Sequence, residues 1–277
     1  MGIKNTEIRY NDGTSSWQLQ IFGHPANTTA IIESFHVSFL LGRHVWTIFK
    51  DNRGCYSGKA YTTILKLTGC LESEFTCDDG QCVDMGDRCN QIVDCRDNSD
   101  EKDCSLLVKE KSYNKKVAPF SVLVLDSKPK VVQANINVSI TVMNIIEIRE
   151  VDHIITLKFG IILEWYEHRA VYHNLKKQVS LNSFSDAETD QIWVPYVIYK
   201  NTDNNDAVTI GDTKTTVAIT REGGLTRSTM DFADEIEIFL GSENRLTLNQ
   251  SYTKEFHCTY QLHWFPFDTQ VTTQSVI

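Results

Sequence analysis

Six of the eight cysteines fall in one acidic window, residues 70–104, which holds 11 Asp and Glu against 3 Lys and Arg. They are Cys70, Cys77, Cys82, Cys89, Cys95 and Cys104. Cysteines this dense form either disulfides or a metal–thiolate site, and thiolate sites usually contain closely spaced Cys pairs. The window contains no CxxC pair. We therefore expect disulfides, which persist outside the reducing cytosol and indicate a secreted protein or an ectodomain.

The acidic side chains of this window indicate a calcium site. A segment this short buries too little apolar surface to fold unaided, so disulfides and a metal must stabilise it. Carboxylates in this number suit Ca²⁺ rather than Zn²⁺, because Ca²⁺ prefers hard oxygen ligands. An acidic, solvated surface without a metal is the alternative. Spacing alone leaves every pairing of the six cysteines open.

The window resembles an LDL-receptor class A repeat over its whole length, through Phe75, Asp79–Cys82 and the Asp94–Glu101 signature. The resemblance implies the disulfides Cys70–Cys82, Cys77–Cys95 and Cys89–Cys104. It also implies a structural Ca²⁺ held by the side chains of Asn90, Asp94, Asp100 and Glu101 and by the backbone carbonyls of Asp87 and Ile92. The family usually has Asp where this chain has Asn90, so we expect weaker Ca²⁺ binding here.

The whole chain has 277 residues, 41% of them hydrophobic, and a net charge of -9. This length and composition predict two or three folded domains rather than disorder. Nucleic acid is not expected as a partner, because phosphate contacts require clustered Lys and Arg, and no basic cluster stands out. The sequence contains no GxSxG, HExxH or phosphate-binding glycine loop, so we do not expect an enzyme.

Period-two alternation predicts that the C-terminal half is mainly antiparallel β structure. From Ala134 to Val142, apolar residues alternate with polar ones, which places the apolar set on one buried sheet face. The segments Ile155–Trp165 and Phe256–Trp264 repeat the pattern. Several such strands, separated by polar turns, predict an antiparallel β-sandwich.

The last of these strands runs into the turn Phe265-Pro266-Phe267-Asp268. Pro fixes its own φ and Asp can accept backbone N–H groups, so the turn is rigid. With Cys258, seven residues before it, the turn resembles the signature loop of the pentameric Cys-loop ligand-gated channels, and the segments around Trp165 and Trp193 resemble other parts of that family. The resemblance covers residues 120–277 and implies a pentamer of receptor subunits that binds a small-molecule, neurotransmitter-like ligand.

The chain also departs from that family. A second Cys normally closes the loop fourteen positions after the first, but that position is Thr272, so Cys258 is expected to be an inert buried thiol. Family ligand sites lie between subunits and hold cations in aromatic boxes. The corresponding ligand-binding positions are Tyr199 with Lys200, and Phe159 beside Gly160, so a quaternary ammonium ligand is not expected. Both Trp165 and Trp193 are expected in the core.

Residues 1–69 are predicted to be a partial β segment. Phe35–Val37 and Trp46–Asp51 resemble one hairpin of the pentraxin and laminin-G jelly rolls. Such domains often carry a Cys where this chain has Ser38, which leaves Cys55 without an obvious mate. Residues 105–119 are Lys-rich and end near Pro119, which predicts an extended linker before the ligand-binding domain, residues 120–277.

Three glycosylation sequons, at Asn27, Asn137 and Asn249, agree with an extracellular location. The N-terminus lacks the apolar core of a signal peptide, and no run of 18 apolar residues is present. We therefore expect a fragment of a membrane receptor that lies on the extracellular face and lacks the pore.

Two functions remain open. In the first, the chain is part of a channel subunit, and the resemblance implies that the signature loop pushes on membrane helices when ligand tilts the sandwich. In the second, the chain is a secreted, Ca²⁺-dependent adhesion or scavenging protein whose acidic module binds a basic partner. A third alternative is an incomplete gene model, whose unfinished sandwich would expose a raw sheet edge.

Overall fold

The computed structural model describes residues 6–21, 28–33, 40–50, 60–109, 111–125, 128–133, 135–199, 201–202, 216–229 and 233–258. The chain divides into two compact units, one made of residues 1–104 and 227–237 and the other of residues 105–226 and 238–277. Both are mainly β with antiparallel pairing, which confirms the predicted fold class. Within the described ranges, no helix has the length and apolar character needed to cross a membrane.

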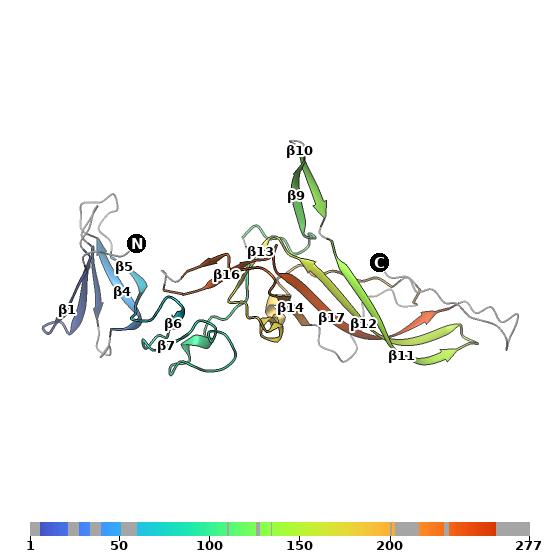
Figure 1. Cartoon of the computed structure of the whole chain (residues 1–277), viewed down its shortest axis with the longest axis horizontal. Coiled ribbons are helices and arrows are strands. Elements are labelled where there is room, and N and C mark those ends of the chain that lie inside the picture. The colour runs from blue at the N-terminus through green and yellow to red at the C-terminus, as the bar shows by residue number, and fades with distance from the viewer. Residues whose placement is uncertain are drawn as a thin grey trace. The chain divides into compact units, whose positions relative to one another are not determined.

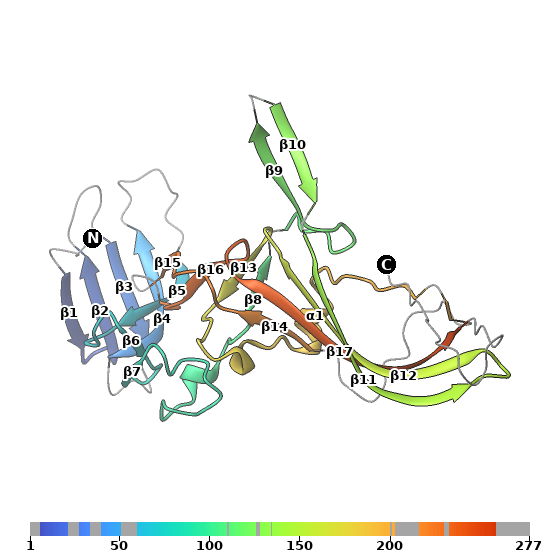
Figure 2. The ribbon, with the colours of Figure 1, turned by 45° about the vertical axis from the view of Figure 1, so that its right-hand side comes forward.

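The first unit begins with a five-stranded antiparallel sheet in which each strand pairs with the next along the chain (Figure 2). Its strands are β1 (Thr6–Asn11), β2 (Ser16–Ile21), β3 (Thr28–Glu33), β4 (Gly42–Lys50) and β5 (Tyr61–Leu67). Leu19, Trp46 and Ile48 form a small buried core on this sheet. Cys55 and Phe35–Val37 lie outside the described residues, so the predicted jelly-roll hairpin remains a prediction.

The cysteine-rich window follows, and we call residues 70–104 the cystine module. It contains the short hairpin of β6 (Glu74–Thr76) and β7 (Cys82–Asp84) and the 3₁₀ turn η1 (Ser99–Glu101). Gly42 connects the module to the sheet: its φ is +106°, and a Cβ there would lie 2.0 Å from the Asp78 carbonyl oxygen. Arg43 donates its backbone N–H to that same oxygen at 3.1 Å. Only glycine allows this close approach, so the sheet and the module form one unit.

The second unit is the β-sandwich, and its longest strands are labelled in Figure 1. One sheet has the order β11-β12-β17-β14, the other contains β16, β13 and β8 in that order, and β9 and β10 form a separate hairpin. The short strand β15 falls among the residues 227–237 that are assigned to the first unit. The bounds are β8 (Leu107–Lys109), β9 (Phe120–Leu125), β10 (Lys128–Gln133), β11 (Asn137–Arg149), β12 (Ile154–Tyr166), β13 (Ala170–His173), β14 (Thr216–Thr220), β15 (Arg227–Ser228), β16 (Glu237–Leu240) and β17 (Arg245–His257), with η2 (Val179–Asn182) and α1 (Asp186–Thr189) between β13 and β14.

The central strand β12 bears out the alternation read from its sequence. Ile155, Leu157, Phe159, Ile161, Leu163 and Trp165 are all buried. They pack in one cluster with side chains of β17, including Leu246, Leu248, Tyr252 and Phe256. The period of two therefore identified the core face of this strand correctly.

The edge strand β11 differs from expectation. Its apolar residues do alternate, but Val138, Ile140 and Val142 are 49–58% exposed rather than buried. Alternation determines which side chains share a sheet face, but it does not determine whether another layer covers that face. Among the described residues, no layer covers these side chains of β11.

The predicted linker also differs. Within residues 105–119, Leu106 is buried in the sandwich core and β8 pairs with β13. The Lys and Pro content suggested an extended connector, but Leu107–Lys109 pair with β13 as a short edge strand. The sandwich therefore begins directly after Cys104, where the structural division of the chain also lies.

Candidate functional site

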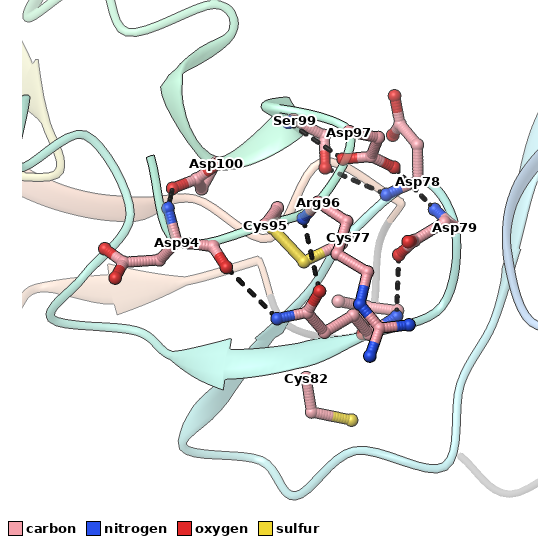
Figure 3. Close-up of a disulfide and its surroundings, with 12 residues drawn as sticks. Cys77, Asp78, Asp79, Cys82, Asp94, Cys95, Arg96, Asp97, Ser99 and Asp100 are labelled. Carbon is pink, nitrogen blue, oxygen red and sulfur yellow. Dashed lines mark hydrogen bonds between the residues drawn. A yellow bond between two sulfur atoms is a disulfide. The ribbon is translucent and has the colours of Figure 1, made fainter. Parts of the chain in front are cut away.

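The cystine module contains three disulfides, Cys70–Cys82, Cys77–Cys95 and Cys89–Cys104. They join the same cysteines that the LDL-receptor class A resemblance implies. Phe75, Met85, Cys77 and Cys95 form its small core, and Figure 3 shows the Cys77–Cys95 bond among the acidic loop residues. Two clusters with metal-site spacing, Cys70–Glu74–Cys82 and Cys77–Cys95–Asp97, each contain a disulfide. Their sulfurs are therefore not thiolate ligands, and neither cluster is a thiolate metal site.

The acidic loop is ordered by carboxylates that accept backbone N–H groups. Asp100 Oδ2 accepts from Asp94 N at 2.7 Å, a contact drawn in Figure 3. Glu101 Oε1 accepts from the backbone nitrogens of Asn90 and Gln91 at 2.7 and 3.0 Å. These hydrogen bonds fix the backbone at the positions that the resemblance implies as calcium ligands. They matter here because the loop has almost no apolar core.

The donor types of this loop suit a Ca²⁺ ion, and one of its carboxylate oxygens lacks a partner. Asp100 is completely buried, and its Oδ1 atom has no hydrogen-bond partner among the described residues. A buried carboxylate oxygen without a donor is costly unless a cation or water satisfies it. Asn90 and Asp94 lie beside each other, with Asn90 Nδ2 3.1 Å from Asp94 Oδ2. Three carboxylates and hard oxygen donors are the set that Ca²⁺ prefers.

A fourth carboxylate, Asp97, is not among the implied calcium ligands but stabilises the loop through hydrogen bonds. It accepts hydrogen bonds from Asp79 N at 2.7 Å and Ser99 N at 2.9 Å. Burial alone would raise the pKa of Asp97, but the bonds from Ser99 and Asp79 outweigh it and lower the pKa below its usual value. Asp97 therefore stays ionised and links the two halves of the module.

The signature loop lies largely outside the described residues. Phe265, Pro266, Phe267, Asp268 and Thr272 are all beyond residue 258, so their expected roles stay predictions. Cys258 is described: it is 7% exposed, and its Sγ lies 3.7 Å from the Phe256 carbonyl oxygen. It is a buried thiol at the end of β17, as expected of an inert cysteine.

The two described ligand-binding candidates meet inside the sandwich. The rings of Phe159 and Tyr199 lie 5.8 Å apart, edge to face, and both side chains are buried. Tyr252 and Phe256 complete the aromatic cluster, and the Lys254 ammonium lies 4.7 Å from the centre of the Tyr199 ring. A cation of the protein itself therefore already faces this ring. Lys200 lies outside the described residues.

Burial also affects the phenols of this cluster. Desolvation raises the pKa of Tyr252 to about 12 and that of Tyr199 further, and the proximity of Tyr252 adds to the latter. Both phenols stay neutral at physiological pH. The expected core position of Trp165 is confirmed, because this side chain is 1% exposed and packs edge to face with the half-buried Trp193 at 6.0 Å.

Two of the three glycosylation sequons lie among the described residues. Asn137 on β11 and Asn249 on β17 are both exposed, as attachment of a glycan requires. Asn27 lies outside the described residues.

Two buried acids escaped sequence reasoning. Glu167 is fully buried in the sandwich, where Arg169 Nε and Tyr113 Oη donate to it at 2.7 and 2.9 Å. Glu235 is 3% exposed in the first unit, where Lys66 Nζ lies 2.6 Å away. Glu235 shows no local pattern, because its cationic partner Lys66 lies 169 residues away. The partner of Glu167 is Arg169, only two residues away, so the Glu-x-Arg spacing was the one local signal of that pair.

Comparison with known proteins matches two segments of the chain to protein families. Residues 68–104 match the low-density lipoprotein receptor domain class A, and residues 102–274 match the neurotransmitter-gated ion-channel ligand binding domain. A vitellogenin receptor of Solenopsis invicta is 41% identical over 51 residues, which are 18% of this chain and 3% of that receptor. The chain thus spans a very small part of that relative. Because the channel-domain match covers more than half of its residues, the chain belongs to the neurotransmitter-gated ion-channel ligand-binding domain family.

Proposed function

We propose that this chain is the extracellular ligand-binding region of a subunit of a pentameric neurotransmitter-gated ion channel, with an LDL-receptor class A module before it. The family match over residues 102–274 carries the proposal, and the antiparallel sandwich agrees with it. The family consists of receptors that form pentamers and bind small-molecule neurotransmitters. Its ligand-binding domains lie on the extracellular side of the membrane, which agrees with the disulfides of the module.

The ligand site is proposed to include Phe159, Tyr199 and Lys200. The Lys254 ammonium at the face of Tyr199 supports a ligand that presents a carboxylate rather than a quaternary ammonium, because a second cation there would meet like charge. Such ligands include amino-acid transmitters.

A binding experiment tests this function. The full chain, secreted from animal cells, is titrated calorimetrically with glutamate, γ-aminobutyrate, glycine and acetylcholine, and its mass is measured by light scattering. We expect saturable binding of one carboxylate ligand, assembly into five-copy particles, and at least tenfold weaker binding in Lys200→Ala. Lys177→Ala, an exposed lysine of the same sandwich, is the matched control and should bind normally. A monomer that binds none of the four ligands would contradict the proposal.

Calcium is proposed to be held by Asn90, Asp94, Asp100 and Glu101 and by the carbonyls of Asp87 and Ile92. The orphaned Oδ1 of Asp100 supports it. Bound Ca²⁺ would supply the positive charge that lets three carboxylates gather in a module without a large core. Chelator should lower the melting temperature of the first unit, and Asp94→Asn should remove that response. Glu72→Gln, an exposed acid of the same module, is the control and should keep it.

The module alone does not favour the adhesion function, since a class A repeat also occurs here directly before a channel domain. Capture of a lysine-rich partner protein by the full chain, abolished by chelator and unaffected by Lys200→Ala, would favour adhesion instead.

Glycans are proposed at Asn137 and Asn249, whose side chains are exposed. Removal of N-glycans should increase the gel mobility of the secreted chain, and Asn→Gln substitution of both positions should reduce that change.

A further inference from the structure

The first unit contains a binding site for one acidic side chain. Glu235, which lies far along the chain from the rest of this unit, has its carboxylate 96% shielded from solvent. Four groups donate to it: Arg43 Nη2, Lys66 Nζ at 2.6 Å, Thr76 N at 2.9 Å and Thr76 Oγ1 at 3.0 Å. Two cations and two neutral donors therefore saturate this single carboxylate.

The same site also holds the backbone before and at Glu235. Arg43 Nε donates to the Ala233 carbonyl, and Arg88 Nη1 donates to the carbonyls of Asp234 and Glu235. Glu235 has a φ of +44°, a left-handed conformation that is unfavourable for a residue with a side chain. Residues 233–235, the captured segment, are thus bound through three carbonyls and one carboxylate, as a short acidic peptide would be.

The groups that hold this segment come from two different elements. Arg43 and Lys66 lie on β4 and β5 of the sheet, whereas Thr76 and Arg88 belong to the cystine module. We call these four residues the basic clamp. The Phe75 ring orders it, because the guanidinium groups of Arg43 and Arg88 each lie 4.5 Å from its centre.

The electrostatics of the basic clamp call for an anion. Burial and the proximity of Arg43 lower the pKa of Arg88 to about 10, even though Glu235 and Asp234 raise it. Two guanidinium groups and an ammonium in a buried site are costly without a counter-charge. Glu235 supplies the buried part of that charge, while Asp78 Oδ1 lies 3.8 Å from Arg43 Nη1 and Asp234 and Asp103 also act on Arg88.

The site is larger than the segment it holds. A cavity of about 340 Å³ borders the captured segment, lined by Phe75, Arg88, Lys102, Ala233, Asp234 and Ile236 among others. Two donors of the clamp, Arg43 Nη1 and Arg88 Nε, are buried and have no hydrogen-bond acceptor in the described part of the chain. The captured segment therefore borders a cavity on one side, whereas its carboxylate and these two donors are buried.

We propose that the basic clamp is an acidic-peptide-binding site whose resident ligand is the chain's own segment 233–235, held as a releasable latch. The captured segment lies within the stretch that matches the channel ligand-binding domain, whereas the clamp is built by the sheet and the cystine module. Through the latch, the basic clamp binds a segment of the sequence that matches the channel domain, and this binding depends on charge. This inference does not depend on which transmitter the receptor binds.

Limited proteolysis and peptide binding on the full chain test the latch. Arg227 is the last trypsin site before the captured segment in the sequence, and trypsin should cut after it at least tenfold faster in Glu235→Gln than in the native chain. A synthetic peptide of residues 229–238 should bind Glu235→Gln, and bind the native chain at least tenfold more weakly because its site is filled. The same peptide with Gln in place of Glu235 should not bind. Glu243→Gln, which removes an exposed carboxylate of the sandwich, is the matched control and should behave as the native chain.

Equal cleavage of the native chain and Glu235→Gln, or failure of the peptide to bind the variant, would overturn the proposal. If Glu235→Gln does not fold, Lys66→Met replaces it. This variant removes one of the four donors and keeps the shape of the side chain, so cleavage after Arg227 should still rise several-fold. Unchanged cleavage in a folded Lys66→Met chain would equally overturn the latch.

Discussion

The cystine module has a buried core of only four described residues, Phe75, Cys77, Met85 and Cys95, whereas the described core of the sandwich contains 21. Three disulfides and a dense set of carboxylates replace apolar burial in the module. The sandwich also buries a few polar side chains, such as Glu167 and Asn182, but apolar residues make up most of its core. The two regions should therefore fail under different treatments, which makes their contrast testable.

The largest effect is expected from Glu167→Ala in the sandwich. Glu167 is fully buried and pairs with Arg169, whose side chain is only 20% exposed, so the substitution leaves a cation without its partner. Breaking a buried pair on one side typically costs about 3–5 kcal/mol. Hydrogen exchange followed by mass spectrometry should show faster exchange across the sandwich and little change in the cystine module. Glu164→Ala, which breaks a partly exposed pair with Arg245, should cost less than about 1 kcal/mol.

A second prediction concerns the module alone. Replacing Cys77 and Cys95 together by Ser removes a buried disulfide that forms part of its small core, at a cost of about 2–4 kcal/mol. The module should lose its protection from hydrogen exchange while β12 and β17 keep theirs. Cys258→Ser, which changes a buried thiol outside the module, is the control and should leave the module unchanged. Simultaneous unfolding of both units would refute their independence.

A third prediction sharpens the electrostatic side of the contrast. Asn90→Asp restores an anionic side chain at a proposed calcium position and should tighten Ca²⁺ binding about tenfold, or roughly 1.4 kcal/mol. Calorimetric titration of the full chain with Ca²⁺ measures it. Asn98→Asp adds the same charge to the module outside the proposed ligand set and should change the affinity much less. Equal effects of both substitutions would mean that overall charge, rather than coordination, sets the affinity.

Local patterns predicted the features that depend on neighbouring residues. The six cysteines and their acidic spacing identified the whole module, because every contact within it spans a short stretch of chain. The alternation of β12 identified its core face, since the strand is central and covered. The same alternation failed for the burial of Val138 and Ile140, because coverage of an edge strand depends on other layers.

Features that depend on distant residues were out of reach. Nothing near Glu235 indicates that it would meet Arg43, 192 residues earlier, and its own surroundings are an ordinary acidic stretch. The assignment of residues 227–237 to the first unit interrupts the continuous domain 120–277 that the sequence led us to expect. A pairing at this separation is chosen by the complete fold, so a single sequence carries no local sign of it.

The smallest effect is expected from acid acting on α1, whose N-terminus also fixes the start of the sandwich. Glu188 accepts hydrogen bonds from Ser185 in a capping box and from Leu106 N at 2.7 Å. Burial alone would raise the pKa of Glu188, but the bonds from Ser185, Ser105 and Leu106 together lower it below its usual value. A carboxyl with a depressed pKa in the folded state stabilises the fold above its unfolded pKa of about 4.3, and this contribution is lost as the pH falls further.

Thermal melts of the native chain and Glu188→Gln between pH 6 and pH 3 measure this contribution. The melting temperature of the sandwich should fall less steeply with acid in the variant, by a difference of up to about 2–4 °C. Asp186→Asn, in the same first turn of α1, is the control and should leave the pH dependence closer to that of the native chain. An identical slope in the native chain and Glu188→Gln would show that the sandwich does not rely on this carboxylate.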